Sequence, residues 1–147
     1  MPVLEDMTPA IAQDLRTRRE AVVDAHIRAE AVDHSVAATL ATFRSPSYYV
    51  PAVGGVVDGA DAVGGLLGQL FQAFPDFWVE RKVTYHADDA VILEIRFGGT
   101  HRGEWAGIPA TGKAMAVEAA CVFEFDGADL LCEKVYFDHA TVLRQIQ

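Results

Sequence analysis

The amino-acid sequence predicts an α+β fold in which helices come first and antiparallel strands follow. In the first half, apolar residues recur at three- and four-residue steps, as in amphipathic helices. In the second half, short segments rich in β-forming residues alternate with turns, and no internal repeat or linker divides the chain. With 147 residues, 51% of them hydrophobic and 22% charged, the chain can form its own core. We therefore expect one domain over residues 1–147.

The N-terminal third is expected to form two helices. Thr8 followed by Pro9 is a cap with a proline at the first helical position, which predicts a long helix over residues 10–31. Asp33 is then placed to cap a second, short helix. The apolar face of the long helix is expected to carry Ile11, Leu15, Val22, His26 and Ile27. Its solvated face is expected to carry Arg16, Arg18 and Arg19.

The middle of the chain predicts an extended segment and a third helix. Residues 48–50 are rich in β-forming side chains and begin the extended segment. The turn at Asp58 and Gly59 starts the helix, and Pro75 ends it because the residue before a proline disfavours helical backbone.

The second half is expected to form four antiparallel strands and a closing helical turn. The strands are placed at residues 77–86, 90–97, 114–125 and 130–138, and the helical turn at 140–147.

The stretch 98–113 between the second and third of these strands is too long and too rich in glycine for a minimal hairpin. It contains His101 and Trp105, residue types that line ligand openings. Long ordered loops of this kind are often functional, so we expect this loop to belong to a site.

The last two strands allow side chains to be assigned to faces. If the turn at Asp126–Asp129 closes a regular hairpin, Ala119 lies opposite Tyr136 and Val117 opposite Asp138. Asp138 then ends an apolar face, where desolvation would raise its pKa and suit it to proton transfer. This inner face is expected to carry Val117, Ala119, Cys121, Phe123, Phe125, Leu130, Cys132, Tyr136 and Asp138. The opposite face is expected to carry Glu118, Val122, Glu124, Glu133, Val135 and Phe137.

Lys134 does not fit the inner, apolar face to which this register assigns it. Three explanations are open. Lys134 pairs with an acidic side chain, its side chain extends to solvent, or a β-bulge changes the register of the strand. A slip of one residue would invert the face of every later residue in the strand.

Composition and charge exclude several classes of partner. The net charge of −9 argues against nucleic acid, since phosphate binding needs clustered Lys and Arg. No apolar run is long enough to span a membrane and no signal pattern opens the chain, so we expect a cytoplasmic protein without a membrane partner. Cys121 and Cys132 form neither a disulfide framework nor a metal motif and are expected as free thiols, and we expect no metal.

Three short motifs together resemble a known family. They are Phe-Pro-Asp-Phe at 74–77, Gly-Thr-His-Arg-Gly-Glu at 99–104 and Gly-Ile-Pro-Ala-Thr-Gly-Lys at 107–113, followed by a last strand that ends in an aromatic residue and Asp138. In this order they resemble the SnoaL-like polyketide cyclase branch of the nuclear transport factor 2-like superfamily.

The resemblance implies a cone-shaped fold in which a curved antiparallel sheet wraps around the helices and leaves a deep apolar pocket. It also implies a homodimer formed through the outer sheet face. Cyclases of this branch use an acidic side chain as acid and base in an intramolecular aldol closure, without metal or cofactor. Asp138 matches the family's aspartate and His101 its loop histidine, whereas Lys134 stands where the family often has tryptophan.

On this basis we expect a small apolar molecule as substrate. The expected catalytic residues are Asp138, His101 and Tyr136. The expected substrate-binding residues are Tyr48, Phe74, Trp78, Trp105, Cys121 and Phe123.

Alternative interpretations remain for the site. Glu94 and Arg96 share a strand face, and with Asp138 they would suit the Asp-Arg-Asp arrangement of limonene-epoxide hydrolases; otherwise they form an exposed ion-pair ladder. A ketosteroid-isomerase-like enzyme or a non-catalytic, dimeric ligand-binding module would use the same pocket. His101 can also be a structural loop residue, and Asp138 a cap for the C-terminal helix.

Overall fold

The structure is a computed structural model that describes residues 2–147, with side chains from residue 12 onward, so the expectation for the Ile11 side chain lies outside the described part. Its elements in chain order are α1 (Pro2–Ala31), α2 (Val36–Leu40), β1 (Ser47–Val50), a 3-10 turn η1 (Pro51–Val53), β2 (Gly55–Asp58), α3 (Ala60–Ala73), β3 (Trp78–His86), β4 (Ala90–Thr100), β5 (Ala114–Asp126), β6 (Asp129–Phe137) and α4 (His139–Ile146). Among the described residues, no helix combines the length and apolar character needed to cross a membrane.

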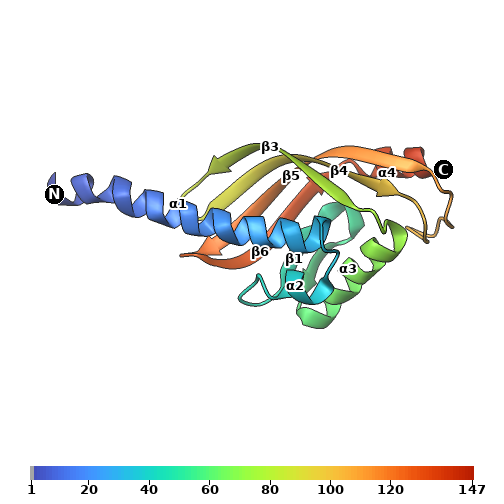
Figure 1. Ribbon diagram of the computed structural model, residues 1–147, viewed down its shortest axis with the longest axis horizontal. Helices are drawn as coiled ribbons and strands as arrows, with labels where there is room; N and C mark the ends of the chain where they lie inside the picture. The colour runs from blue at the N-terminus through green and yellow to red at the C-terminus, as the bar shows by residue number, and fades with distance from the viewer. Residues whose placement is uncertain (1) are drawn as a thin grey trace.

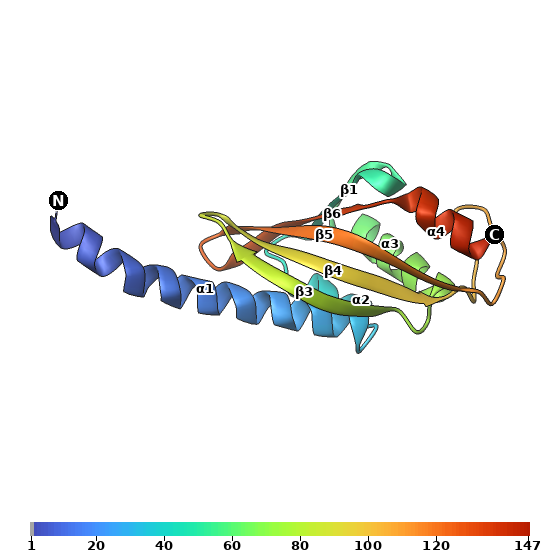
Figure 2. The same ribbon diagram turned by 90° about the horizontal axis from the view of Figure 1, so that it is seen from above.

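The strands form one curved, open sheet in the order β2-β1-β6-β5-β4-β3. Neighbouring strands are antiparallel except β1 and β6, which are parallel. Helix α1 lies along the sheet and extends beyond it on its N-terminal side, while α2 and α3 cover the same side further along (Figures 1 and 2). The core lies between the sheet and these helices, which confirms the expected α+β fold.

The long helix begins earlier than the sequence predicts. It starts at Pro2, so Thr8 and Pro9 lie inside it rather than at its first turn. A cap followed by proline favours a helix start but does not prevent helical backbone on its N-terminal side. The cap of α2 also differs, because the Ser35 hydroxyl, rather than Asp33, accepts a hydrogen bond from the Ala38 amide at 3.1 Å.

Arg19 fastens α1 to the sheet and is not solvated, contrary to the sequence-based expectation. Its side chain is buried and donates to the carbonyls of Gly127 at 2.7 Å and Asp88 at 2.9 Å, which belong to the β5–β6 and β3–β4 turns. The guanidinium also lies over the Phe125 ring. A planar guanidinium can donate to several carbonyls at once, which explains its burial. Arg16 and Arg18 are exposed, as expected.

A β-bulge in the β5–β6 hairpin changes the expected register. The turn closes as predicted and Phe125 pairs with Leu130, but Glu124 then pairs with Cys132, which leaves Leu131 as an extra residue. All later β6 side chains therefore point to the face opposite the predicted one.

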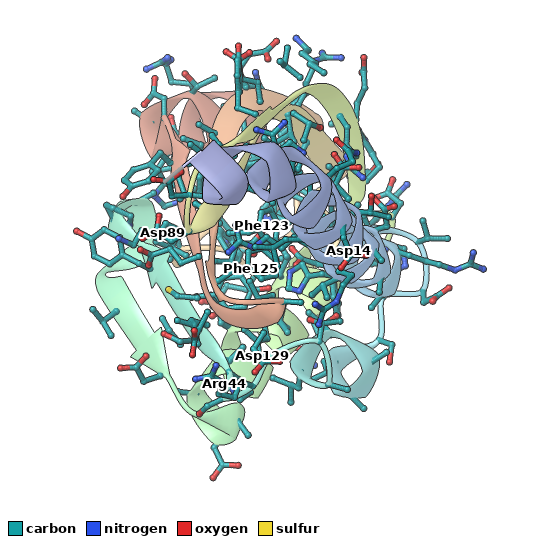
Figure 3. All side chains as sticks on the ribbon, turned by 90° about the vertical axis from the view of Figure 1, so that its left-hand side faces the viewer. Asp14, Arg44, Asp89, Phe123, Phe125 and Asp129 are labelled. Carbon is teal, nitrogen blue, oxygen red and sulfur yellow. The ribbon has the colours of Figure 1, made fainter. Side chains whose placement is uncertain are left out.

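The bulge leaves the β5 assignments correct and inverts those of β6. Phe123 and Phe125 of β5 lie in the interior, as Figure 3 shows. On β6 the inward residues are Glu133, Val135 and Phe137 rather than Cys132, Tyr136 and Asp138. Lys134 points outward, 3.4 Å from the Glu124 carboxylate, which removes its conflict with the apolar face.

Candidate functional site

A partly open cavity of about 100 Å³ lies between the inner face of the sheet and the helices. Most of its wall is aliphatic or aromatic, and aromatic rings come from β1, the segment after α3, β4, β5, β6 and the loop after β4. These aromatic residues are Tyr48, Phe74, Phe77, Phe97, Phe123, Phe137 and Trp105.

One part of the wall is polar, because four side chains from three elements meet there. His26 and Glu30 come from consecutive turns of α1, Tyr48 from β1 and Glu133 from β6. The parallel pairing of β1 with β6 sets Tyr48 directly beside Glu133 in the sheet. The inverted register of β6 turns the Glu133 carboxylate inward, so the bulge is what brings this cluster together.

His26 is at the centre of the cluster. Its Nε2 lies 3.0 Å from Glu30 Oε2, 3.3 Å from Glu133 Oε2 and 3.0 Å from the Tyr48 hydroxyl. The Tyr48 hydroxyl also donates to Glu30 Oε2 at 2.9 Å. His26 and Glu133 are 1% and 5% exposed, so these contacts are shielded from water. Charged hydrogen bonds in such a setting are stronger than in water.

The hydrogen bonds also fix the protons on His26. The Thr42 hydroxyl donates to the Thr39 carbonyl at 2.7 Å, so towards His26 Nδ1, 2.8 Å away, it acts as an acceptor. Nδ1 therefore carries a proton. Nε2 faces the carboxylate oxygens of Glu30 at 3.0 Å and Glu133 at 3.3 Å, and the negative charge of both favours a proton on it. The geometry thus favours a doubly protonated imidazolium.

The pKa shifts agree with this arrangement. Burial alone lowers the pKa of His26, but the carboxylates of Glu133 and Glu30 outweigh it and raise this pKa to about 10. Burial raises the pKa of Glu133, and the neighbouring His26 only partly opposes that rise. Burial likewise raises the pKa of Tyr48, which keeps its hydroxyl protonated.

One carboxylate oxygen of Glu133 has unused capacity to accept a hydrogen bond or a proton. Apart from its contact with the His26 imidazole, Glu133 Oε2 has no hydrogen-bond partner among the described side chains and backbone. A buried carboxylate oxygen with unused acceptor capacity and a raised pKa is suited to take a proton from a bound molecule.

His26, Glu30 and Glu133 are also the residues that could together approach a metal ion within the described part of the chain. Their donor atoms lie within 4.8 Å of one another. However, the Nε2 position that would face a cation is suited to hold a proton between the two carboxylates, and Tyr48 completes the hydrogen bonds of Glu30. The arrangement is explained by hydrogen bonding, and we assign no metal to it.

Most of the expected substrate-binding residues line the cavity. These are Tyr48, Phe74, Trp105, Cys121 and Phe123. Trp78 does not line it, because its position on β3 faces the outer side of the sheet, where the Arg96 guanidinium lies 5.6 Å from its ring centre. The expectation of a wall position for Trp78 is therefore wrong.

Asp138 does not have the environment that the sequence predicts. Its side chain is 62% exposed and caps α4, accepting hydrogen bonds from the Ala140 amide at 3.1 Å and the Thr141 hydroxyl at 2.7 Å. The Thr141 hydrogen bond outweighs the small effect of desolvation and lowers the pKa of Asp138. The expected desolvation and raised pKa are thus wrong, because the β6 bulge moved Asp138 away from the inner face.

Tyr136 also lies outside the cavity. It points to the outer face of the sheet, is exposed and packs edge-on against Tyr49. Glu94 and Arg96 are exposed on that outer face as well, so they do not form an epoxide-hydrolase arrangement with a pocket acid.

His101 is buried in the loop after β4 and does not reach the cavity. Its Nδ1 lies 2.9 Å from the Thr111 hydroxyl, and its ring packs against Phe74. This position fits the structural role that we considered for it.

The glycine-rich loop is fastened to the end of α3. The amides of Arg102 and Gly103 donate to the Ala73 carbonyl at 2.8 and 3.2 Å. A Cβ atom on Gly103 would lie 2.4 Å from the Gln72 carbonyl oxygen. Asp76 accepts hydrogen bonds from the Thr100 amide at 2.6 Å and the Thr100 hydroxyl at 2.7 Å. The motifs around residues 74–77 and 99–104 therefore hold the loop against the helix.

The sequence reasoning missed His26, Glu30 and Glu133 as site residues. Two signals pointed to them: a histidine and a glutamate four residues apart on the apolar side of a helix, and the misplaced Lys134, which indicated a bulge. A bulge before Lys134 puts Glu133 on the inner face.

Solved structures of similar fold come from several bacteria. AclR, a putative hydroxylase from Streptomyces galilaeus, superposes with a TM-score of 0.76 at 21% identity, covering 88% of this chain and 81% of that one. A putative SnoaL-like polyketide cyclase from Jannaschia sp. CCS1 gives a TM-score of 0.74 at 18% identity, covering 88% and 92%. A protein of ketosteroid isomerase-like fold from Catenulispora acidiphila, solved with trimethylamine, gives 0.72 at 21% identity, covering 85% and 91%.

These identities show a shared fold, which is the expected nuclear transport factor 2-like or ketosteroid-isomerase-like one. Among proteins with curated descriptions, none matches this chain in sequence. The sequence profile described as SnoaL-like polyketide cyclase matches residues 15–146, nearly the whole chain. The chain therefore belongs to the SnoaL-like polyketide cyclase family.

Proposed function

We propose that this protein is an enzyme of the cyclase or isomerase type that moves a proton on an apolar carbonyl compound bound in the inner cavity. The observation that carries this proposal is the single polar cluster in an otherwise apolar cavity, where Glu133 has an unpaired carboxylate oxygen beside the His26 imidazolium. Titratable groups with shifted pKa in a largely apolar pocket are typical of active sites.

In this proposal Glu133 is the catalytic acid and base. Its Oε2 takes a proton from the carbon next to the substrate carbonyl, and the resulting enolate carbon forms a bond to a second carbonyl of the same molecule. The alkoxide formed at that second carbonyl takes the proton back from Glu133. No proton is gained or lost overall, so the carboxylate is ready for the next molecule.

The other members of the cluster support this proton transfer. His26 carries the positive charge that stabilises the Glu133 carboxylate, and Thr42 fixes the orientation of its ring. The Tyr48 hydroxyl lines the cavity and stays protonated. It donates to Glu30 in the structure, and in this proposal it turns from Glu30 to donate to the substrate oxygen where negative charge develops. In an isomerase the same groups would return the proton to another carbon.

Exchange of carbon-bound protons for deuterium tests the proposal. Hexane-2,5-dione is a suitable probe, because it is small and can close on itself by an aldol reaction. In D₂O, wild-type protein should accelerate exchange at its α carbons, and Glu133→Gln should reduce this acceleration by about 100-fold or more, the usual contribution of a general base. Nuclear magnetic resonance follows both the exchange and the ring closure.

Glu118→Gln is the matched control, since Glu118 lies on the outer face and pairs with Lys82. It should exchange like wild type. Acceleration that survives in Glu133→Gln would contradict the assignment of Glu133. Binding without any accelerated exchange in wild type would favour a second candidate, a non-catalytic binding module, which the apolar cavity also suits.

A further inference from the structure

A second cavity adjoins the inner one. It has a volume of about 280 Å³ and lies between α3, the loop after β4 and the start of α4. Val53, Leu66 and Trp105 line both cavities, so they form the partition between them. The outer cavity also has polar groups in its wall, the Gln69 amide and the His139 imidazole.

Of the three partition residues, Trp105 is the one carried by a loop. Val53 belongs to η1 and Leu66 to α3, whereas Trp105 begins a tight turn closed by paired backbone hydrogen bonds with Ile108, of 3.1 and 2.9 Å. The two residues at the tip of this turn, Ala106 and Gly107, have φ of +49° and +78°. Trp105 therefore begins a compact hairpin that follows, in the chain, the residues 102 and 103 that hydrogen-bond to the end of α3.

A single hydrogen bond fastens the indole ring. Trp105 Nε1 donates to His139 Nε2 at 3.0 Å, and the ring also meets Phe74 edge-on. Because an indole nitrogen only donates, His139 Nε2 must be the unprotonated nitrogen of its ring in this arrangement. This bond ties the loop to the first residue of α4 and holds the indole in the wall that the two cavities share.

The size of the inner cavity makes the partition important for the choice of substrate. Its volume of about 100 Å³ is below the roughly 150 Å³ of an apolar cavity that holds benzene. The inner cavity is thus too small for two fused rings unless part of its wall is displaced. A fused-ring or long-chain carbonyl compound needs additional space, and the larger outer cavity is the neighbouring space.

We propose that Trp105 is a movable wall, and that substrates larger than one ring occupy both cavities with the indole turned aside. The reacting carbonyl then lies at the inner cluster, and a polar end of the molecule lies beside Gln69 and His139. Trp105 is in this view a specificity-determining residue rather than a catalytic one. The inference rests on the proposed function only in taking the inner cluster as the reacting end.

Binding of two probes to the full-length protein tests the movable wall without measuring turnover. Phenol represents one ring and 2-naphthol represents two fused rings with a polar group. If wild type must displace the indole to bind 2-naphthol, Trp105→Ala removes that cost and tightens 2-naphthol at least about tenfold. Phenol should change less than about threefold, because a single ring needs much less additional space than two fused rings. Isothermal titration calorimetry gives both dissociation constants.

Trp78→Ala is the matched control, since Trp78 is the other tryptophan and faces away from both cavities. It should leave both dissociation constants unchanged. Equal affinity of 2-naphthol for Trp105→Ala and wild type, or an equal gain for phenol, would overturn the proposal. Neither result depends on Glu133, so a failure here is distinct from failure of the proposed proton transfer.

A milder variant keeps the test decisive if Trp105→Ala does not fold. Trp105→Phe keeps an aromatic ring in the wall but removes the donor to His139, so 2-naphthol should bind about threefold more tightly, the effect of one net hydrogen bond. In Trp78→Phe protein the only indole N–H resonance is that of Trp105. It should shift on addition of 2-naphthol and not of phenol, and a resonance unmoved by bound 2-naphthol would contradict a movable wall.

Discussion

At the scale of single residues, the environment of each carboxyl group decides which one can do chemistry. Glu133 is buried beside an imidazolium, whereas Asp138 is an exposed helix cap. The sequence points to Asp138 because strict alternation along β6 puts it on the inner face. The alternation pattern cannot show that Leu131 is an extra residue. The sign of it in the sequence is Lys134, which unbroken alternation would place on the apolar inner face.

The buried cluster predicts how stability changes with pH. The pKa of His26 is raised from 6.5 to about 10, so its contribution is fully present below pH 6.5 and is lost as the pH rises through about 10. The pKa of Glu133 is raised too, which acts in the same direction above its ordinary value of 4.5. The free energy of unfolding should therefore fall from neutral to alkaline pH, as urea denaturation can measure.

Glu133→Gln is the variant that checks this origin. Without the Glu133 carboxylate the pKa of His26 loses the largest of the effects that raise it, so the fall in stability between pH 6.5 and 10 should become smaller. An unchanged slope in Glu133→Gln would show that other groups cause the pH dependence.

At the scale of elements, most helices and strands could be predicted because their periodicity is strong. Strand β2 could not, since it is short and lies between glycines and the turn at Asp58 and Gly59. The parallel contact between β1 and β6 could not be predicted either, because no local pattern specifies which distant strands pair. That contact places Tyr48 beside Glu133, so sequence periodicity alone could not predict the cluster.

The contact between the glycine-rich loop and α3 gives a prediction about stability. An added Cβ on Gly103 would meet the Gln72 carbonyl at 2.4 Å. Gly103→Ala should therefore lower the free energy of unfolding by about 1–3 kcal/mol, as overpacking commonly does. Gly65→Ala is the control, because open space surrounds that site on α3. It should stabilise the helix by about 0.5–1 kcal/mol. Equal effects of both variants in chemical denaturation would refute the close-contact explanation.

At the scale of the whole molecule, the fold could be predicted through the family resemblance, and the structure confirms it. The cavity walls from β5 were also predictable, because that strand alternates without interruption. The homodimer that the resemblance implies stays a prediction. Its expected surface is the outer sheet face, where Val83, Tyr85 and Tyr136 are exposed.

A charge on that surface tests the dimer. Tyr136→Glu would place two carboxylates in an apolar interface, where an unpaired charge is costly, and should shift the protein toward monomer. Val32→Glu is the control, because Val32 is exposed in the segment between α1 and α2, away from the sheet. Analytical ultracentrifugation measures the distribution. A wild-type protein that is monomeric at high concentration would contradict this expectation.

In the proposed reaction Glu133, and not Asp138, moves the proton. The most direct measurement compares Glu133→Gln with Asp138→Asn in the deuterium exchange of hexane-2,5-dione. We predict that Glu133→Gln loses about 100-fold or more of the acceleration. Asp138→Asn should stay within about threefold of wild type, since an exposed cap mainly affects helix stability. Loss of exchange in Asp138→Asn with full exchange in Glu133→Gln would contradict the assignment of the proton transfer to Glu133.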